Sequence, residues 1–247
     1  MYLAADYTPE FDSFKERLLE LAQIRSVAEL LRRVVTRLAE PPYVAQARIW
    51  LVDRGDLCSS CCMRLKCPDQ TSCLHLVASA GRPHADPKSD WSRLDDEFQR
   101  IPLGVGKIGR VAATGRALVV KDVGRNPSQL SPPDWAMAEK ILGFDAQPIR
   151  YKDEVLGVLG LFTRIPIPEQ GPAWLRIFAD HIAVALVNAR AFEENDRLRA
   201  RLELETTYLR EEVREAKALG NIHDVAGLTR YAIAEGIIES DVRLTIT

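Results

Sequence analysis

The residues most suited to chemistry are five cysteines that gather in one short segment. All of them lie within residues 58–73, and the rest of the 247-residue chain contains none. A secreted disulfide framework spreads an even number of cysteines over a small domain, and this pattern does not. Clustered cysteines in a chain without a secretory signal indicate metal ligation or thiol redox chemistry in the cytoplasm. The five are Cys58, Cys61, Cys62, Cys67 and Cys73.

Four of these cysteines follow the spacing C-x2-C-x5-C-x5-C. A C-x2-C pair can turn both sulfurs toward one point around a tight loop, and two further cysteines can complete a set of four. Four thiolates suit tetrahedral zinc or an iron–sulfur cluster. A usual zinc module has a second closely spaced pair of Cys or His ligands, and this chain lacks that second pair. The spacing therefore favours an iron–sulfur cluster and leaves zinc as the alternative. The predicted ligands are Cys58, Cys61, Cys67 and Cys73, with Cys62 as a substitute ligand or a reactive thiol.

Sequence patterns typical of enzymes are missing from the chain. It contains no G-x-S-x-G nucleophile elbow, no H-E-x-x-H zinc motif and no G-x-x-x-x-G-K-[ST] loop for phosphates. Its four histidines share no spacing that would suggest a joint site. The sequence therefore predicts a protein that is not an enzyme.

The overall composition is that of an ordinary globular protein. Hydrophobic residues make up 47% of the chain, charged residues 28%, and the formal net charge is -2. A near-neutral balance lacks the basic footprint of a nucleic-acid-binding protein. No apolar run is long enough to span a bilayer. We therefore expect a cytoplasmic protein with no direct nucleic-acid or membrane partner.

The elements that must position the cysteines can be predicted from hydrophobic periodicity. Apolar residues at three- and four-residue steps predict a helix over residues 10–40, which Pro41 and Pro42 end. The order of helix, strand, loop, strand, short helices, strand, hairpin and long helix indicates an α+β fold, with an antiparallel sheet and helices packed to one side. The predicted strands are 46–53, 75–80, 117–121 and the hairpin 144–151 with 154–164, and the long helix covers 171–218.

Two stretches of this pattern resemble the GAF domain, a small ligand-sensing module. They are IPLGVGKIGRVAATGRALVVKDV, residues 101–123, and FDAQPIRYKDEVLGVLGLFTR, residues 144–164. The first contains the family's G-x-I-G-x-V-A-x-T-G stretch and a strand that ends in Asp-Val. The resemblance implies a GAF-like antiparallel sheet flanked by helices, with a sensor domain over 1–192 and a cysteine-rich insertion at 56–74.

The resemblance also implies a ligand pocket between the sheet and the segment 82–145. Pockets of this kind are mostly apolar with a few polar anchors. The alternative is that the aromatic residues of this segment only pack in the core, as aromatics often do. The candidate lining residues are Trp91, Phe98, Trp135 and Phe144, with Arg110 and Lys121 as polar partners.

A narrower resemblance concerns the cysteine segment and the charged helix that follows the domain. Residues 58–82 are similar to an insertion in the GAF domains of sigma-54-type transcriptional activators, and residues 194–216 are similar to their linker. Those insertions carry proline where this chain has Cys62, which implies that Cys62 is not a ligand. The resemblance implies an output to transcription, through a partner or an attached domain.

The last predicted helix has the spacing of a coiled-coil seam. Apolar or tolerated residues recur at steps of three or four that average about 3.5, with charged residues around them: Asn195, Leu198, Leu202, Thr206, Leu209, Val213 and Ala216. We expect a coiled-coil signalling helix over 193–218 and a parallel homodimer through residues 172–218. The alternative is a single exposed helix. Residues 219–247 form a tail to which the sequence assigns no role.

Taken together, these features favour a cytoplasmic GAF sensory module. A metal or iron–sulfur centre in the cysteine segment would report redox state, oxygen or nitric oxide, and a dimeric coiled coil would carry the signal to a transcriptional output. Two alternatives stay open. One is a structural dimerisation module in which zinc only braces the loop. The other is a GAF domain that binds a small-molecule effector without any dependence on metal.

Overall fold

The computed structural model describes residues 23–67, 70–123, 130, 133–219, 229, 230, 232 and 233, with side chains in the last helix as far as 211. The chain divides into two units after Glu193. The predicted helix segment 10–22 and most of the tail 219–247 lie outside the described residues. Among the helices of the described part, none is long and apolar enough to cross a membrane.

The first unit is built on a six-stranded antiparallel sheet with the order β3-β2-β1-β6-β5-β4. The predicted strands are confirmed, and a short additional strand, β3, lies beside β2. Strand β1 is buried over its first eight residues because it lies inside a sheet that is covered on both faces. The strands are β1 (Val44–Arg54), β2 (Ser72–Gly81), β3 (Arg100–Pro102), β4 (Leu118–Val120), β5 (Gly143–Tyr151) and β6 (Glu154–Thr163).

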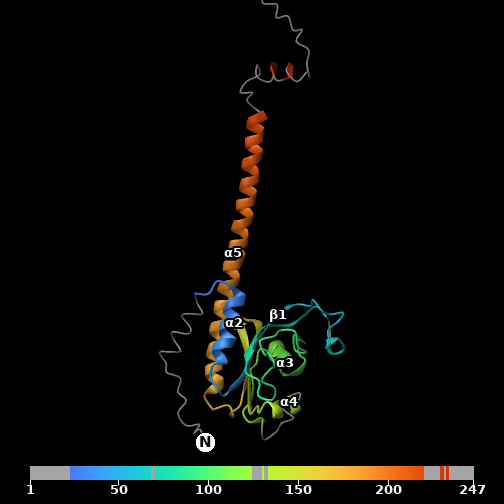
Figure 1. The fold of residues 1–247 in the computed structure, drawn as a ribbon, viewed down its shortest axis with the longest axis vertical. Coiled ribbons are helices and arrows are strands. Elements are labelled where there is room, and N and C mark those ends of the chain that lie inside the picture. The colour runs from blue at the N-terminus through green and yellow to red at the C-terminus, as the bar shows by residue number, and fades with distance from the viewer. Residues whose placement is uncertain are drawn as a thin grey trace, which may run out of the picture. The chain divides into compact units, whose positions relative to one another are not determined.

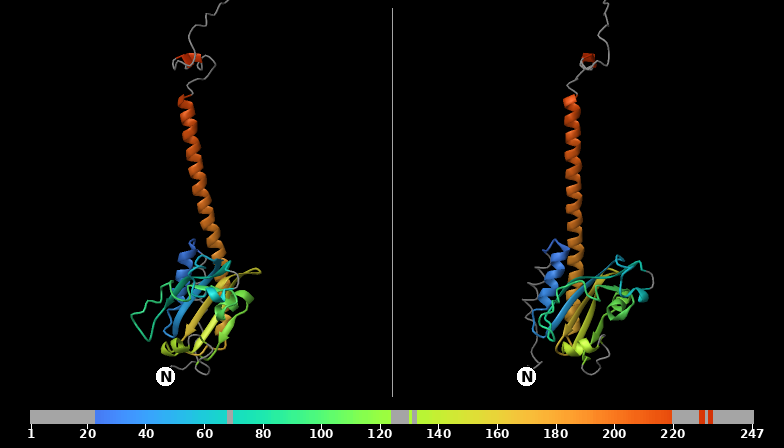
Figure 2. Two further views of the ribbon diagram at one scale, coloured as in Figure 1. Left: turned by 90° about the vertical axis from the view of Figure 1, so that its right-hand side faces the viewer. Right: turned by 45° about the vertical axis from the view of Figure 1, so that its right-hand side comes forward.

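Helices cover both faces of this sheet, not one as predicted (Figures 1 and 2). The reason is that β1 and β6 carry apolar side chains on both faces, so each face needs a cover. One face packs against α2 and the start of α5, and the other packs against α3 and α4. The helices are α2 (Val27–Leu38), α3 (Gly106–Thr114), α4 (Pro133–Ala138) and α5 (Gly171–Leu219).

The core on the α2 and α5 face explains why these helices form there. In α2, buried apolar residues recur as adjacent pairs one turn apart, which makes a single apolar stripe. The same core contains Leu51 of β1 and the α5 residues Phe178, Ile182 and Leu186. Helix α2 begins at Val27, whose backbone N–H donates to Glu193 Oε1 at 2.8 Å. The described helix is therefore shorter than predicted, because residues 23–26 are not helical.

The core on the α3 and α4 face is centred on Trp50 of β1. Its indole N–H donates to the carbonyl oxygen of Phe98 at 2.9 Å, which fixes the loop before β3 against the sheet. A Cβ on Gly160 of β6 would lie 3.0 Å from the indole ring, so glycine there leaves room for the large side chain. The indole ring thus fills the space over β6 that a larger residue at position 160 would occupy.

Candidate metal-binding site

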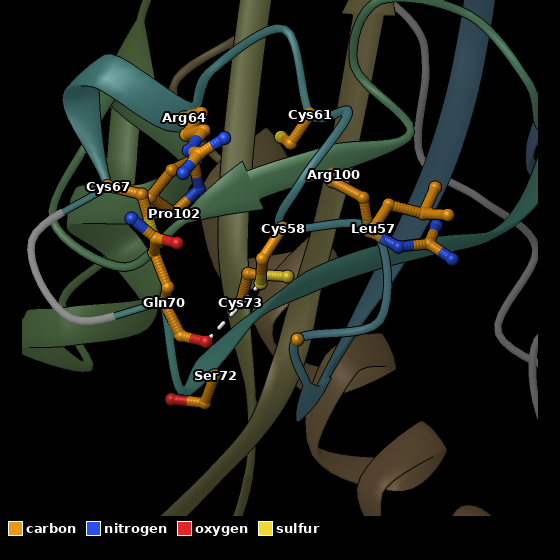
Figure 3. A pocket seen from close by; sticks show the side chains of 11 residues that line it. Leu57, Cys58, Cys61, Arg64, Cys67, Gln70, Ser72, Cys73, Arg100 and Pro102 are labelled. Atoms are coloured by element: carbon orange, nitrogen blue, oxygen red, sulfur yellow. Dashed lines mark hydrogen bonds between the residues drawn. The ribbon is translucent and has the colours of Figure 1, made fainter.

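Four of the five cysteines line one small cavity, and they are the four predicted ligands. The cavity has a volume of about 20 Å³. Figure 3 shows Cys67 and Gln70 across from Cys58 and Cys61, with Cys73 of β2 between them. The structure thus brings three cysteines of the segment between β1 and β2 next to Cys73 at the start of β2.

Consecutive tight turns fold the cysteine segment back on itself. Ser60 N–H donates to the carbonyl of Leu57 at 3.0 Å, and Arg64 N–H donates to the carbonyl of Cys61 at 3.0 Å. A short 3-10 helix, η1 (Arg64–Lys66), follows, and Cys67 N–H closes it on the carbonyl of Arg64 at 3.1 Å. None of the η1 residues is buried. Backbone hydrogen bonds therefore shape this segment, and Met63 packs against the core on the α3 and α4 face.

The two arms of the segment approach closely at Gly55. Its N–H donates to the carbonyl of Thr71 at 2.9 Å. A Cβ at Gly55 would lie 2.5 Å from Cys58 Sγ and 2.9 Å from the carbonyl oxygen of Gln70. The Cys58 thiol donates to that same oxygen at 3.3 Å. Only glycine fits at this neck without displacing a predicted ligand.

Cys73 is the ligand candidate that the sheet itself holds. It is 8% exposed and pairs with Pro102 of β3 in the register of the sheet. Burial raises the pKa of its thiol to about 11, although the positive charge of Arg100 acts in the opposite direction. A metal cation that replaces the thiol proton would remove this penalty, because a thiolate bound to a metal is no longer an isolated buried charge.

Arg100 lines the cavity and forms an ion pair with Asp56. The guanidinium of Arg100 donates to both carboxylate oxygens of Asp56, at 2.7 and 2.6 Å. This pairing holds the pKa of Asp56 well below its usual range and raises that of Arg100. His75 Nε2 lies 3.7 Å from Asp56 and has no hydrogen-bond partner among the described residues. The sequence places His75 close to Cys73 but does not reveal Arg100, which the register between β2 and β3 pairs with His75.

The cysteines surround the cavity, but their sulfurs are not in ligating positions. Within the described ranges, no group of three or more His, Cys, Asp or Glu side chains has an arrangement that could hold a metal ion. Binding would require the thiols to rotate inward and Cys58 to release the carbonyl of Gln70. The predicted ligand set and the predicted metal or thiol chemistry therefore stay predictions.

Cys62 lies apart from the other four cysteines. It is exposed, and its thiol donates to the carbonyl oxygen of Glu97 at 3.3 Å. It lines a second cavity of about 200 Å³, next to Cys61 and an acidic run that includes Asp96. Asp96 forms an ion pair with the buried Arg48 of β1, which anchors this run to the sheet.

The predicted effector-pocket residues divide into two groups. The aromatic ones come together in the core below α3 and α4, where the ring centroids of Trp91 and Trp135 are 6.0 Å apart. Phe162, which the sequence reasoning missed, joins them at 5.4 Å from Trp135 and 4.9 Å from Phe144. Phe98 packs against the same core.

The two predicted polar partners of that pocket lie elsewhere. Arg110 is exposed and donates to the carbonyl of Gly106 in its own helix at 3.0 Å. Lys121 is exposed as well, and its carbonyl accepts from Ile167 N–H at 2.9 Å. The fold therefore gathers the aromatic residues and leaves the cations outside the cluster, and the effector pocket stays a prediction.

Known structures of similar fold include sensor domains and enzymes. A GAF domain of a phosphoenolpyruvate-protein phosphotransferase from Coxiella burnetii has a TM-score of 0.51 and 20% identity, over 73% of this chain and 94% of that one. Free methionine-R-sulfoxide reductase from Neisseria meningitidis has a TM-score of 0.51 and 19% identity, over 77% and 98%. The reduced form of fRMsr from Staphylococcus aureus has a TM-score of 0.52 and 16% identity, over 74% and 99%. At these identities the similarity concerns the fold.

These neighbours correct the prediction that the protein is not an enzyme. Reductases share this fold, so the absence of familiar catalytic motifs is no argument against catalysis. The physical reason is that activity depends on side chains placed on a scaffold, and one scaffold accepts different sites. A short catalytic motif identifies only the enzymes that use that motif.

No match was found among curated proteins. The family model described as GAF domain matches residues 25–187, which is more than half of the chain and includes the whole sheet with its cysteine segment. The chain therefore belongs to the GAF domain family.

Proposed function

We propose that this GAF domain is a cytoplasmic regulatory module whose cysteine-lined cavity binds a soft metal through thiolates and responds to oxidation of that centre. The observation that supports the proposal is the placement of Cys58, Cys61, Cys67 and Cys73 around one cavity. Soft thiolate ligands select zinc, cuprous copper and iron centres.

Two cationic side chains could offset the charge of a metal–thiolate site in the cavity. Arg64 and Arg100 both line it, and a site with four thiolates around a divalent ion carries a net negative charge. Neighbouring cations lower the cost of that charge. Arg100 is itself held in place by Asp56, so its guanidinium is a fixed part of the wall. Removal or oxidation of a bound centre would leave a segment that has few apolar contacts of its own.

Alternation along the strands supplies a route from the cavity to α5. Cys73 and His75 are two residues apart on β2 and therefore point to the same face of the sheet. His75 pairs with Leu51 of β1 in the register, so Leu51 shares that face. Leu51 belongs to the core that contains α2 and α5. A shift of Cys73 would thus act on the face where α5 packs.

The output of such a module would be a change in helix packing. Packed helices have discrete alternative arrangements, so a small shift of the sheet can select one of them. We propose that α5 forms the predicted homodimer and transmits the change to an attached or separate output, of which transcriptional control is one. The exposed leucines of α5 support the dimer and do not identify the output.

The decisive experiment compares two adjacent cysteines. The protein and its Cys61→Ser and Cys62→Ser variants are purified without oxygen, and zinc, iron, copper and sulfide are measured with the absorption spectrum. We expect metal in the wild type and in Cys62→Ser, and a loss of most metal in Cys61→Ser. Absence of metal in anaerobic wild-type protein and after reconstitution would refute the proposal. Metal that is retained through oxidation, without a change in helix dimerisation, would favour the structural brace.

A second candidate function is reduction by thiols. Cys62 offers an exposed thiol in the 200 Å³ cavity that Cys61 also lines, and similarly folded proteins include free methionine-R-sulfoxide reductases. In this reaction a sulfoxide and two protein thiols give a thioether, a disulfide and water. The test is methionine formation from free methionine-R-sulfoxide with dithiothreitol. Turnover that Cys62→Ser abolishes would support the candidate, and no turnover would eliminate it.

A further inference from the structure

We infer that Asp145 makes the attachment of α5 to the sheet sensitive to pH: ionisation of its carboxyl loosens the first turns of α5, and protonation closes them. This inference goes beyond the proposed function, because it involves no cysteine and no metal. It gives the helix that the proposal treats as the output a second input, the proton. The observations that carry it are the burial of the carboxyl, its bridge to α5 through Gln147, and an amide oxygen without a partner.

Asp145 places a carboxyl group on the apolar face of the sheet that α5 covers. It is 1% exposed, and in the register of the sheet it pairs with Leu161 of β6 and Val119 of β4. Alternation along β5 puts Gln147 and Ile149 on the same face, and Ile149 belongs to the core that contains α5. A buried carboxylate needs a cation or several donors to compensate it, and the side chains of its two strand neighbours are apolar.

Gln147 connects this carboxyl with the start of α5. Its Nε2 donates to Asp145 Oδ1 at 2.7 Å and lies 3.5 Å from the carbonyl oxygen of Pro172, in the first turn of α5. Its Oε1 is buried and has no hydrogen-bond partner among the described residues. The site therefore holds more acceptors than donors. A protonated carboxyl adds a donor and a carboxylate adds only acceptors, so this site accommodates the protonated form better.

The charged and titratable groups on the surrounding elements do not compensate the carboxylate. Burial raises the pKa of Asp145 from 3.8 to about 6, the hydrogen bond from Gln147 acts in the opposite direction, and no charged group within the described ranges contributes. Those groups are exposed, paired elsewhere or at the far end of the β5–β6 hairpin: Lys121 after β4, Arg150 and Tyr151 on β5, Glu154 on β6, Arg164 with Glu139 after β6, Glu169 before α5, and Arg176, Asp180 and His181 on α5.

Movement of the start of α5 is the least costly way to hydrate the ionised carboxyl. Beyond Pro172, the buried Leu175 and Phe178 of α5 belong to the core on this face. The connection before the helix is attached to the strand edge by the hydrogen bond from Ile167 N–H to the carbonyl of Lys121, at 2.9 Å. The first N–H groups of a helix have no partner within the helix, and element ends open more readily than central strands. Opening there breaks fewer contacts than separation of β5 from β6.

The direction of the pH response follows from the two protonation states. The closed state binds the proton more tightly than the open state, in which the carboxyl regains its ordinary pKa of 3.8. The closed state is therefore most favoured below about pH 4, and the opening constant rises until the pH passes about 6. A difference of about two pH units corresponds to a rise of up to about 100-fold.

Hydrogen exchange with mass spectrometry on the full chain tests the inference. Protection factors, corrected for the intrinsic pH dependence of exchange, are compared at about pH 5 and pH 7.5 for a peptide that covers residues 171–182. We expect the wild-type factor to fall by about tenfold at the higher pH. Asp145→Asn should keep its protection, and Asp180→Asn should respond like the wild type. A wild-type factor that is equal at both pH values would overturn the inference.

The exchange of β1 shows whether the opening is local. We expect the 171–182 peptide to be less protected than a peptide of β1 at both pH values. Equal protection of the two peptides would mean that the domain opens only as a whole, and it would overturn the coupling to α5. Cys61→Ser should show the wild-type pH response, so this inference and the metal proposal can fail separately.

Gln147→Met tests the bridge between the carboxyl and α5. The substitution removes the donor that lowers the pKa of Asp145, and it removes the contact with Pro172. We expect the pH above which protection stops falling to move upward relative to the wild type. Circular dichroism confirms that the variant is folded. An unchanged pH profile in folded Gln147→Met would contradict the bridge.

Discussion

Cys61 and Cys62 are adjacent in the chain, but only Cys61 lines the four-cysteine cavity. Cys62 instead directs its thiol to the carbonyl of Glu97 and lines the larger cavity beside it. One peptide bond thus separates a predicted ligand from a thiol that faces other surroundings. Substitutions at these two positions therefore distinguish the loss of a thiol that lines the cavity from the loss of a neighbouring cysteine outside it.

Thiol labelling should distinguish the cysteines by their surroundings. In the metal-free, reduced protein we expect Cys62 to react first with iodoacetamide and Cys73 last, because Cys73 is 8% exposed and its burial raises its pKa to about 11. Mass spectrometry of peptides taken at successive times gives each rate. In urea the two rates should converge. If Cys73 in the folded protein were labelled as fast as Cys62, the Cys73 thiol on β2 would not be buried as described.

Arg100→Gln should weaken metal binding more than it weakens the fold. The substitution removes the charge on the cavity wall and the contacts with Asp56, and groups behind metal ligands typically contribute about 10–100-fold in affinity. Because the Asp56 side of this ion pair is exposed, we expect the free energy of unfolding to change by about 1 kcal/mol or less. Cobalt titration and urea denaturation measure the two effects.

The matched control for that substitution is Arg93→Gln. Arg93 also makes a two-point contact with an aspartate, Asp95, at 2.9 and 2.6 Å, but it does not line the four-cysteine cavity. Its loss should leave cobalt affinity unchanged. Equal effects of the two substitutions would mean that only general charge, and not the position of Arg100, influences the site.

Asp145 should make the protein less stable as pH rises toward neutrality. The residue is 1% exposed on β5, and it accepts a hydrogen bond of 2.7 Å from Gln147. Burial raises its pKa from 3.8 to about 6, against the opposing effect of that hydrogen bond. The folded state therefore binds the proton more tightly than the unfolded state, so this contribution to stability is present below about pH 4 and is lost between pH 4 and 6.

Asp145→Asn removes this penalty and keeps an oxygen that accepts from Gln147. At pH 7.5 we expect it to increase the free energy of unfolding by up to roughly 3 kcal/mol, which is what the pKa difference corresponds to. The advantage should vanish below about pH 4, where the wild-type carboxyl is protonated in both states. Urea denaturation at several pH values measures it. Exposed Asp180→Asn should show no such pH-dependent gain.

The coiled-coil prediction can be tested by a pair of leucines on α5. Leu202 lies on the predicted seam with Leu198 and Leu209, whereas Leu204 lies off it, and all four are exposed in the single chain. We expect Leu202→Glu to convert the dimer to a monomer in light scattering, because it places charges opposite each other in the seam. Leu204→Glu should remain dimeric. Wild-type protein that is monomeric at high micromolar concentration would contradict the dimer.

The sequence was sufficient for the strands around the cysteine segment because periodicity is a local property. Apolar β-rich runs on both sides of residues 55–71 predicted β1 and β2 with ends within a few residues. The prediction of helices on one side was wrong because a buried strand gives no sign of which element covers each face. The three-residue strand β3 was too short for a periodic signal.

By itself, the sequence determined the element order, the GAF resemblance and the identity of the four candidate ligands, since these depend on residue types and spacing. The tertiary structure alone decided that Arg100 and Asp56 stand beside Cys73, because the pairing of β2 with β3 is a long-range contact. It also decided that Cys62 lies outside the four-cysteine cavity and that this cavity is small. The direction of a side chain and the volume of a cavity depend on how turns and strands pack in space, and the spacing of residues along the chain does not encode them.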